Sequence, residues 1–153
     1  MAELTPFLWF DDDLQDAVAF WAGIFPDTEL LESTTGADGR VFGGTFRLMG
    51  RTFFALNGGP GHPFTDAISL YVACADQAEV DRCWKALLDG GTPVACGWIT
   101  DRFGLSWQIV PKRLPELLGD PDPARARRAL DAMMGMVKID VAELEAAADG
   151  RTD

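Results

Sequence analysis

The chain has 153 residues, 48% of them hydrophobic and 24% charged, which is typical of a folded domain and excludes an intrinsically disordered protein. Its formal net charge of −11 excludes a basic surface that would bind nucleic-acid phosphates or an anionic membrane. The N-terminus is acidic, the apolar runs are short and the three cysteines lack metal-type spacing. We therefore expect a cytoplasmic protein without a secretory signal or membrane span.

The first part of the chain has the pattern of a β-α-β-β-β unit. An apolar strand is predicted over Leu4–Phe10, and the acidic run Asp11–Asp13 stops it and caps the helix that follows. That helix ends at Pro26, and its apolar residues have amphipathic spacing: Leu14, Ala17, Val18, Trp21 and Ile24. Strands are then predicted over Thr28–Thr35, Val41–Met49 and Thr52–Asn57.

The pattern begins again after the glycine-rich segment Asn57–Pro63. A predicted strand over Ala67–Cys74 is followed by Asp76 and Glu79, which have the spacing of a capping box, and by a helix that ends at Gly90. The remaining strands of this half are predicted over Val94–Thr100 and Ser106–Val110.

Two stretches of the chain repeat at fixed offsets. The stretch Asp13–Trp21 recurs 63 residues later as Asp76–Trp84, and Gly50–Leu56 aligns with Gly104–Val110 at an offset of 54. Such a repeat predicts two tandem βαβββ modules with curved mixed sheets in an α+β fold. The modules are expected at residues 1–57 and 67–111, with a linker at 58–66 and a C-terminal helical extension at 112–153.

The extension is predicted to form three short helices. The first is a helical turn at Leu114–Leu118, and the second has apolar residues at helical spacing as far as Val137. The third begins at Asp140, with Glu143 three residues later as in a capping box. A basic cluster on the second helix is interpreted as a solvated face: Arg125, Arg127 and Arg128.

The residues that usually carry catalysis are scarce. The only histidine, His62, lies in the linker, so no Ser-His-Asp or Cys-His site is expected. The glycines lack the pattern of a P-loop, of a dinucleotide-binding turn or of an S-adenosylmethionine site. Cys74, Cys83 and Cys96 are interpreted as buried small hydrophobic residues, with Cys96 the best candidate for a reactive thiol. No catalytic residue is assigned.

Polar groups within apolar strands are the candidates for binding a ligand. Gln108 lies between two apolar neighbours, so it faces either solvent or a pocket on the side opposite them. Asn57 ends the equivalent strand of the first half. Arg102 follows Asp101 at a strand turn, where the pair forms either a turn clamp or an anion site. The aromatic wall of a core or of a pocket is expected from Trp9, Trp98 and Trp107.

Several motifs carry a resemblance to a known family. They are Thr5–Phe10, Phe20-Trp21, Phe25-Pro26, Phe54–Pro60, Cys96–Trp98, Asp101–Pro111, Ala132–Met134 and Met136–Asp140. With these motifs the chain resembles the vicinal oxygen chelate superfamily, which includes glyoxalase I, and most closely its PhnB-like branch, often labelled demethylubiquinone methyltransferase-like. The resemblance covers nearly the whole chain and implies a glyoxalase-like fold of two modules with open, cup-shaped sheets, paired in a homodimer.

The resemblance also implies where metal ligands would lie. Metal-using members have a histidine on the first strand of each module and a carboxylate on the last strand. The corresponding positions here are residues 5–7 and 68–70 on the first strands, and Phe54 and Gln108 on the last strands. None of the first-strand residues is a usual metal ligand, and of the two last-strand residues only Gln108 has ligating capacity, so we expect no metal and no other cofactor.

The expected function is binding of a small organic molecule in an apolar cup. Its polar anchors would be Gln108, Asn57 and Arg102, with the three tryptophans named above as walls. One alternative is an enzyme, either the S-adenosylmethionine-dependent methyltransferase of the family label or a metal-dependent lyase or dioxygenase. Another is a drug-binding protein of the bleomycin-resistance type. The expected partners are a small-molecule ligand and a second copy of the chain, and neither nucleic acid nor a membrane.

Overall fold

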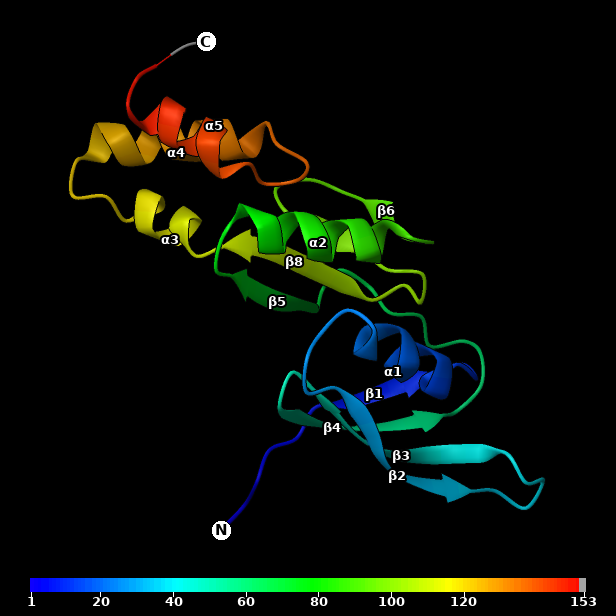
Figure 1. The fold of residues 1–153 in the computed structure, drawn as a ribbon. Coiled ribbons are helices and arrows are strands. Elements are labelled where there is room, and N and C mark those ends of the chain that lie inside the picture. The colour runs from blue at the N-terminus through cyan, green and yellow to red at the C-terminus, as the bar shows by residue number, and fades with distance from the viewer. Residues whose placement is uncertain (152–153) are drawn as a thin grey trace. The chain divides into compact units, whose positions relative to one another are not determined.

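The computed structural model describes residues 1–151, which divide into two compact units, Met1–Pro63 and the described residues from Phe64 onward (Figure 1). The first unit has one helix and one four-stranded sheet. Its elements are β1 (Phe7–Phe10), α1 (Leu14–Ala22), β2 (Glu29–Thr35), β3 (Val41–Leu48) and β4 (Arg51–Asn57). The sheet order is β1-β4-β3-β2, with β1 parallel to β4 and the other pairs antiparallel. This is the predicted βαβββ module.

Aromatic side chains form the core of the first unit between α1 and its sheet. Trp21 of α1 is fully buried, and its ring centroid lies 6.1 Å from that of Phe10 and 5.9 Å from that of Phe46. Phe46 in turn stacks on Phe53, with their ring centroids 5.1 Å apart. The apolar face of α1 is therefore held by three strands, which explains why a helix of nine residues is stable here.

The N-terminus of α1 is capped by a residue that the sequence pattern does not indicate. Asp13 occupies the N-cap position, but its side chain makes no capping hydrogen bond. The amide nitrogen of Leu14 instead donates to Oδ1 of Asn57, at 3.0 Å, from the end of β4. The prediction that an acidic residue of Asp11–Asp13 caps this helix is therefore wrong, because a tertiary contact supplies the acceptor.

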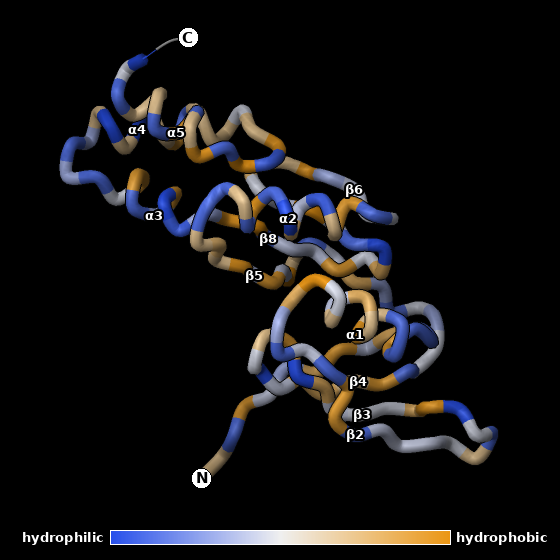
Figure 2. The backbone as a smooth tube through the Cα atoms, viewed as in Figure 1, coloured by the Kyte–Doolittle hydropathy of each residue, from blue (hydrophilic) through white to orange (hydrophobic). Residues whose placement is uncertain are grey.

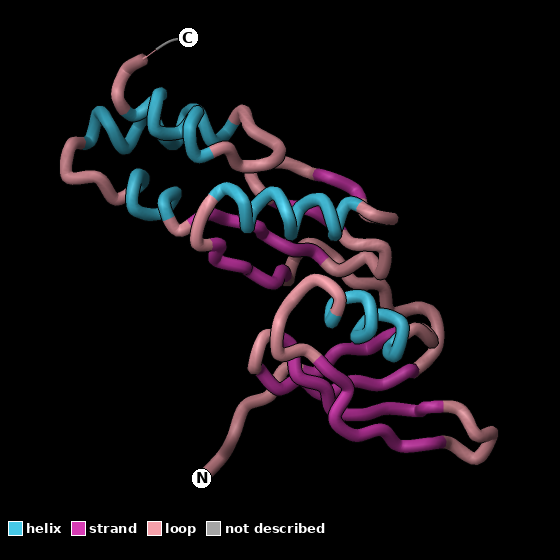
Figure 3. The backbone as a smooth tube through the Cα atoms, in the orientation of Figure 1, coloured by secondary structure: helices cyan, strands magenta, loops and turns pink. Residues whose placement is uncertain are grey.

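The second unit repeats the module and adds three helices. Its module consists of β5 (Ser69–Cys74), α2 (Gln77–Leu88), β6 (Thr92–Pro93), β7 (Trp98–Thr100) and β8 (Ser106–Pro111). The sheet order is β5-β8-β7-β6, and β5 is parallel to β8. Figure 3 shows the helices of the chain in cyan and the strands in magenta. Oδ1 of Asp76 accepts a hydrogen bond from the amide of Glu79 at 2.9 Å, which confirms the predicted cap of α2. Hydrophilic and hydrophobic residues alternate along α2 (Figure 2), and its buried residues are Val80, Cys83, Trp84 and Leu87.

The strand predicted over Val94–Thr100 is interrupted. Only its last part, Trp98–Thr100, forms a strand, β7. The two-residue strand β6 comes before the predicted range. Between them Cys96 and Gly97 adopt positive φ angles of 54° and 86°, which a continuous strand does not allow. Their amides donate to the carbonyl groups of Met136 and Val137, each at 2.8 Å, so the C-terminal segment diverts this part of the chain from the sheet.

The two modules differ by one residue between first strand and helix. Phe7 pairs with Phe54 in the first sheet, and Tyr71 pairs with Gln108 in the second. The first strands are therefore related by an offset of 64, whereas the helix caps keep the offset of 63, because a shorter connection joins β5 to α2. The position that corresponds to Phe7 is thus Tyr71, which lies outside the predicted range 68–70.

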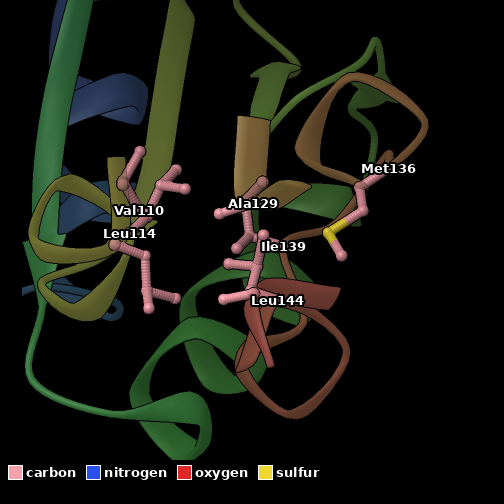
Figure 4. Packing of buried hydrophobic residues seen from close by; sticks show 8 residues of the cluster. Val110, Leu114, Ala129, Met136, Ile139 and Leu144 are labelled. Atoms are coloured by element: carbon pink, nitrogen blue, oxygen red, sulfur yellow. The ribbon is translucent and has the colours of Figure 1, made fainter. Parts of the chain in front are cut away.

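The C-terminal helices pack around a second hydrophobic cluster. They are α3 (Arg113–Leu118), α4 (Pro123–Met134) and α5 (Val141–Ala148), which confirms three short helices, although α4 ends before Val137. The cluster that they share with β8 is shown in Figure 4 and consists of Val110, Leu114, Leu117, Ala129, Met136, Ile139, Leu144 and Ala148. Oδ1 of Asp140 accepts from the amide of Glu143 at 3.0 Å, as predicted.

Side chains of α2 and α4 fix α5 in place. The amide group of Gln77 donates to the carbonyl of Ile139 at 3.0 Å and accepts from the amide of Val141 at 2.7 Å. Arg125 and Arg128 hydrogen bond to the Ala148 carbonyl at the C-terminus of α5. The interpretation of the basic cluster as a solvated face fits Arg127 and Arg128, which are exposed, but not Arg125, which is half-buried. Arg125 and Arg128 also satisfy a carbonyl at the end of a helix.

The fold is confirmed as α+β, with two tandem βαβββ modules followed by helices. In the part of the chain that the structure describes, no helix combines the length and apolar character needed to cross a membrane.

Candidate ligand-binding site

The face of the second sheet opposite α2 carries two rows of side chains. Gln108 in β8 pairs with Tyr71 of β5 on one side and Trp98 of β7 on the other. Two residues earlier, Ser106 pairs with Ser69 and with Thr100 in the same way. Paired residues project to the same face of a sheet, so these six side chains form one surface, called here the open face.

The open face is partly polar and partly aromatic. Nε2 of Gln108 donates to Oγ of Ser69 at 2.9 Å, which fixes the orientation of the half-buried amide. Partial burial and the nearby Cys74 thiol raise the pKa of Tyr71, so its phenol keeps its proton at neutral pH and can donate a hydrogen bond. The surface therefore offers both donors and acceptors beside two aromatic rings.

A pocket of about 320 Å³ lies at the β7 side of the open face. Its lining is mainly apolar and includes three open-face residues; the full set is Asp66, Val94, Ala95, Cys96, Trp98, Ile99, Thr100 and Ser106. The interrupted strand creates this pocket, because Val94, Ala95 and Cys96 belong to the segment that leaves the sheet. The volume lies at the lower end of the range of small-molecule sites, about 300–1,000 Å³.

Trp107 does not reach the open face. Its side chain lies on the α2 side of the sheet, together with that of Ile109. Trp107 is 1% exposed and Ile109 is fully buried. The Trp107 indole donates to Oδ2 of Asp101 at 2.8 Å, and Oδ1 of Asp101 accepts from two amides of the same turn, those of Phe103 and Leu105. Asp101 is therefore the clamp of the β7–β8 turn.

Arg102 is bound to the C-terminus of α2. Its guanidinium donates to the carbonyl of Asp89 at 3.0 and 3.1 Å and contacts the Asp89 carboxylate at 2.9 Å. Of the two readings of the Asp101–Arg102 pair, the geometry supports a turn clamp.

The candidates Asn57 and Trp9 belong to the first unit. Besides capping α1, the Asn57 amide donates to the carbonyl of Val41 at 3.1 Å and to Oε1 of Gln15 at 3.2 Å. The Trp9 indole donates to the Gly59 carbonyl at 2.9 Å, and its ring centroid lies 4.1 Å from that of His62. A pocket of about 350 Å³ touches Asn57, but its lining is mostly charged or backbone: Asp11, Asp12, Gly36, Asp38, Arg40, Val41, Phe42, Asn57 and Gly59.

The structure thus brings together Gln108 and Trp98. Trp107 is buried on the other face of the sheet and Arg102 is bound to the end of α2, whereas Asn57 and Trp9 belong to the first unit. Sequence reasoning missed four members of the open face, which are Ser69, Tyr71, Thr100 and Ser106. The alternation of residues along each strand could have found them, because Ser106 and Gln108 share a face by the two-residue period of a strand. Assigning their partners required the strand register.

The residues at the family's metal positions do not fit a divalent ion. By strand register these positions are Phe7 and Phe54 in the first unit, where neither side chain has a donor atom, and Tyr71 and Gln108 in the second. A neutral phenol and an amide are poor substitutes for the imidazole and carboxylate ligands of such ions. Among residues 1–151, no group of three or more histidine, cysteine, aspartate or glutamate side chains could hold a metal.

Comparison with known proteins places these features in a family. The model of the family 3-demethylubiquinone-9 3-methyltransferase matches residues 2–110. That match includes both sheets almost completely and ends before α3, so the three C-terminal helices lie beyond it. No functionally curated protein is similar enough to the chain to count as a relative.

Solved structures show the same similarity. The chain resembles a PhnB protein from Bacillus cereus that carries the family's name, with 27% identity and a TM-score of 0.65 over 72% of this chain and 99% of that one. It shares its fold with a protein from Pseudomonas aeruginosa at 17% identity and a TM-score of 0.59, over 72% of this chain and 98% of the other.

Proposed function

Because the chain belongs to the 3-demethylubiquinone-9 3-methyltransferase family, a PhnB-like branch of the vicinal oxygen chelate superfamily, we propose that it binds a small organic molecule on the open face of its second sheet. The observation that carries this proposal is the pocket of about 320 Å³ beside Trp98, Thr100 and Ser106. Binding uses no metal in this proposal, because the side chains at the family's metal positions do not suit one.

The chemistry of the lining defines the ligand class. The Trp98 indole supplies a flat apolar wall, and the hydroxyl groups of Thr100 and Ser106 supply a polar edge. Asp66 at the pocket and the net charge of −11 disfavour an anion. The ligand is therefore a neutral or cationic molecule with one aromatic or aliphatic ring system and a hydrogen-bonding substituent. Gln108, held by Ser69, extends this polar edge along β8.

A thermal-shift screen of small neutral, cationic and anionic ring compounds tests the proposal. A compound that binds the folded state raises the melting temperature, because binding to the native state alone stabilises it. For each hit, we expect Trp98→Ala to weaken binding by about tenfold or more, since the aromatic wall is lost. Trp9→Ala, which removes an exposed tryptophan of the first unit, is the matched control and should leave the affinity unchanged.

Three results would contradict the proposal. They are the absence of any stabilising compound, equal affinity in wild type and Trp98→Ala, and loss of affinity in Trp9→Ala alone. Metal analysis of protein purified without chelators tests the metal-free part, which a stoichiometric divalent ion would overturn. If the hits are antibiotics, the drug-binding alternative gains support over a metabolic role.

The family match favours a second candidate, methyl transfer to a quinol precursor. In that case S-adenosylmethionine would supply the methyl group, and the open face would hold the phenolic acceptor. The test is incubation with S-adenosylmethionine carrying a labelled methyl group and a short-chain 3-demethylubiquinol. Labelled product that disappears in Trp98→Ala supports this candidate, and its absence at high protein concentration refutes it.

A further inference from the structure

One wall of the open-face pocket is the turn between β6 and β7, residues 94–97. The amide of Val94 donates to the carbonyl of Trp98 at 3.0 Å, and the amide of Trp98 donates to the carbonyl of Ala95 at 2.9 Å. Val94, Ala95 and Cys96 all line the pocket. Cys96 is half-buried at this wall, which corrects its interpretation as a buried residue, whereas the other two cysteines are buried as predicted. The position of this turn therefore sets the position of the wall.

The turn is held by the connection between α4 and α5, residues 135–140. The amides of Cys96 and Gly97 donate to the carbonyls of Met136 and Val137, each at 2.8 Å. Cys96 has a φ angle of 54°, which is uncommon for a residue other than glycine. A conformation of this kind persists only where the surrounding contacts impose it. The connection supplies those contacts from the part of the chain that follows the second module.

Ile139 packs directly behind the turn and is fully buried (Figure 4). A Cβ atom on Gly97 would lie 3.1 Å from Cγ1 of Ile139 and 3.1 Å from the carbonyl oxygen of Ile109 in β8. Gly97 is therefore packed tightly between the connection and the sheet. On the other side, Nε2 of Gln77 in α2 donates to the carbonyl of Ile139 at 3.0 Å, so the connection is itself fixed to α2.

We propose that the α4–α5 connection sets the width of the open-face pocket and so selects the size of the ring system that binds there. The inference rests on the proposed function, because it concerns the same pocket. The family match ends at residue 110, so this selection belongs to the chain's own C-terminal extension. None of residues 135–140 lines the pocket, and Ile139 acts through the turn as a positioning residue. Without its side chain the turn can relax into the space behind it, which widens the pocket.

Replacement of Ile139 by alanine tests the inference with two probes that carry the same ammonium group. They are benzylamine, with one ring, and 2-(aminomethyl)naphthalene, with two. In nuclear magnetic resonance titrations, we expect Ile139→Ala to raise the affinity for the naphthyl probe relative to benzylamine by about threefold or more over wild type. Hydrogen exchange at the amides of the turn should also become faster, because the turn has lost its support.

Leu144→Ala is the matched control. Leu144 lies in α5, is fully buried and belongs to the same hydrophobic cluster as Ile139 (Figure 4), so its truncation has a comparable cost in packing. We expect it to lower the melting temperature but to leave the affinity ratio and the exchange of the turn as in wild type. Ile139→Val should give a smaller change than Ile139→Ala, in the same direction. If Ile139→Ala does not fold, Gln77→Ala loosens the connection without removing a buried aliphatic group and should change the ratio in the same direction.

Three results would overturn the inference. They are an unchanged or lower affinity ratio in a variant whose turn exchanges faster, unchanged exchange of the turn in Ile139→Ala, and equal changes in Ile139→Ala and Leu144→Ala. Failure of the proposed function gives a different result. In that case wild type binds neither probe, or Trp98→Ala binds both probes as tightly as wild type, and the selection of ligands by the turn fails with it.

Discussion

The side chain of Asn57 is predicted to stabilise the first unit. The change in the free energy of unfolding on replacement of Asn57 by alanine gives the size of this contribution. Oδ1 of Asn57 accepts from the first amide of α1, that of Leu14, at 3.0 Å. Nδ2 donates to the carbonyl of Val41 in β3 at 3.1 Å and to Gln15 at 3.2 Å. One side chain on β4 thus connects the helix to a second strand, and Asn57→Ala removes all three hydrogen bonds.

The expected loss follows from the surroundings of each bond. The bonds to Leu14 and Val41 are partly buried, so each contributes about 1 kcal/mol to the free energy of unfolding, and loss of a helix cap costs a similar amount. The bond to Gln15 is exposed and contributes little. We therefore expect Asn57→Ala to lower the stability of the first unit by about 2 kcal/mol.

Hydrogen exchange with mass spectrometry is the suitable assay, because the chain has two units and need not unfold in one step. Peptides covering α1 should exchange faster in Asn57→Ala, whereas peptides covering α2 should not change. Gln15→Ala is the matched control and should have a small effect. Asn57→Asp keeps the acceptor for Leu14 but loses both donors, so an intermediate effect is expected.

Unchanged protection of α1 in Asn57→Ala would refute this reasoning. Equal effects of Asn57→Ala and Gln15→Ala would refute it as well, since the helix cap would then contribute nothing. Either result would return Asn57 to the ligand-binding candidates, where the sequence placed it.

Three further predictions concern stability. Asp101→Ala removes the acceptor for two turn amides and a buried indole, so urea unfolding should show a loss of about 3 kcal/mol in the second unit. Gln77→Ala breaks two hydrogen bonds to the segment before α5. In hydrogen exchange, the free energy of protection of the α5 amides should therefore fall by about 1–2 kcal/mol, and unchanged protection would contradict the contact. Burial and the neighbouring carboxylates raise the pKa of Asp13 above 3.8 in the folded protein, so its ionised form lowers stability at higher pH. Asp13→Asn should therefore raise the unfolding free energy at pH 7, with no gain below about pH 3, and a gain that is independent of pH would refute this origin.

The sequence was sufficient for the architecture and for much of the local structure. The repeat indicated two modules, and capping residues such as Asp76 and Asp140 marked the starts of helices because a cap acts within one turn of the chain. Alternation of apolar residues in β8 also placed Gln108 on the face opposite Trp107. These features depend on neighbours in the sequence, so local patterns carry them.

The tertiary structure decided everything that depends on strand register and on distant partners. The one-residue difference between the modules became visible only when Phe7 paired with Phe54 and Tyr71 with Gln108. The same holds for the break in the strand at Cys96. It is caused by hydrogen bonds to the segment around Met136, which lies 40 residues further along the chain. Polar side chains such as Asn57 and Arg102 look alike in sequence whether they bind a ligand or a backbone amide. Only the position of their partners in space separates the two roles, because a hydrogen bond is satisfied by geometry and not by residue type.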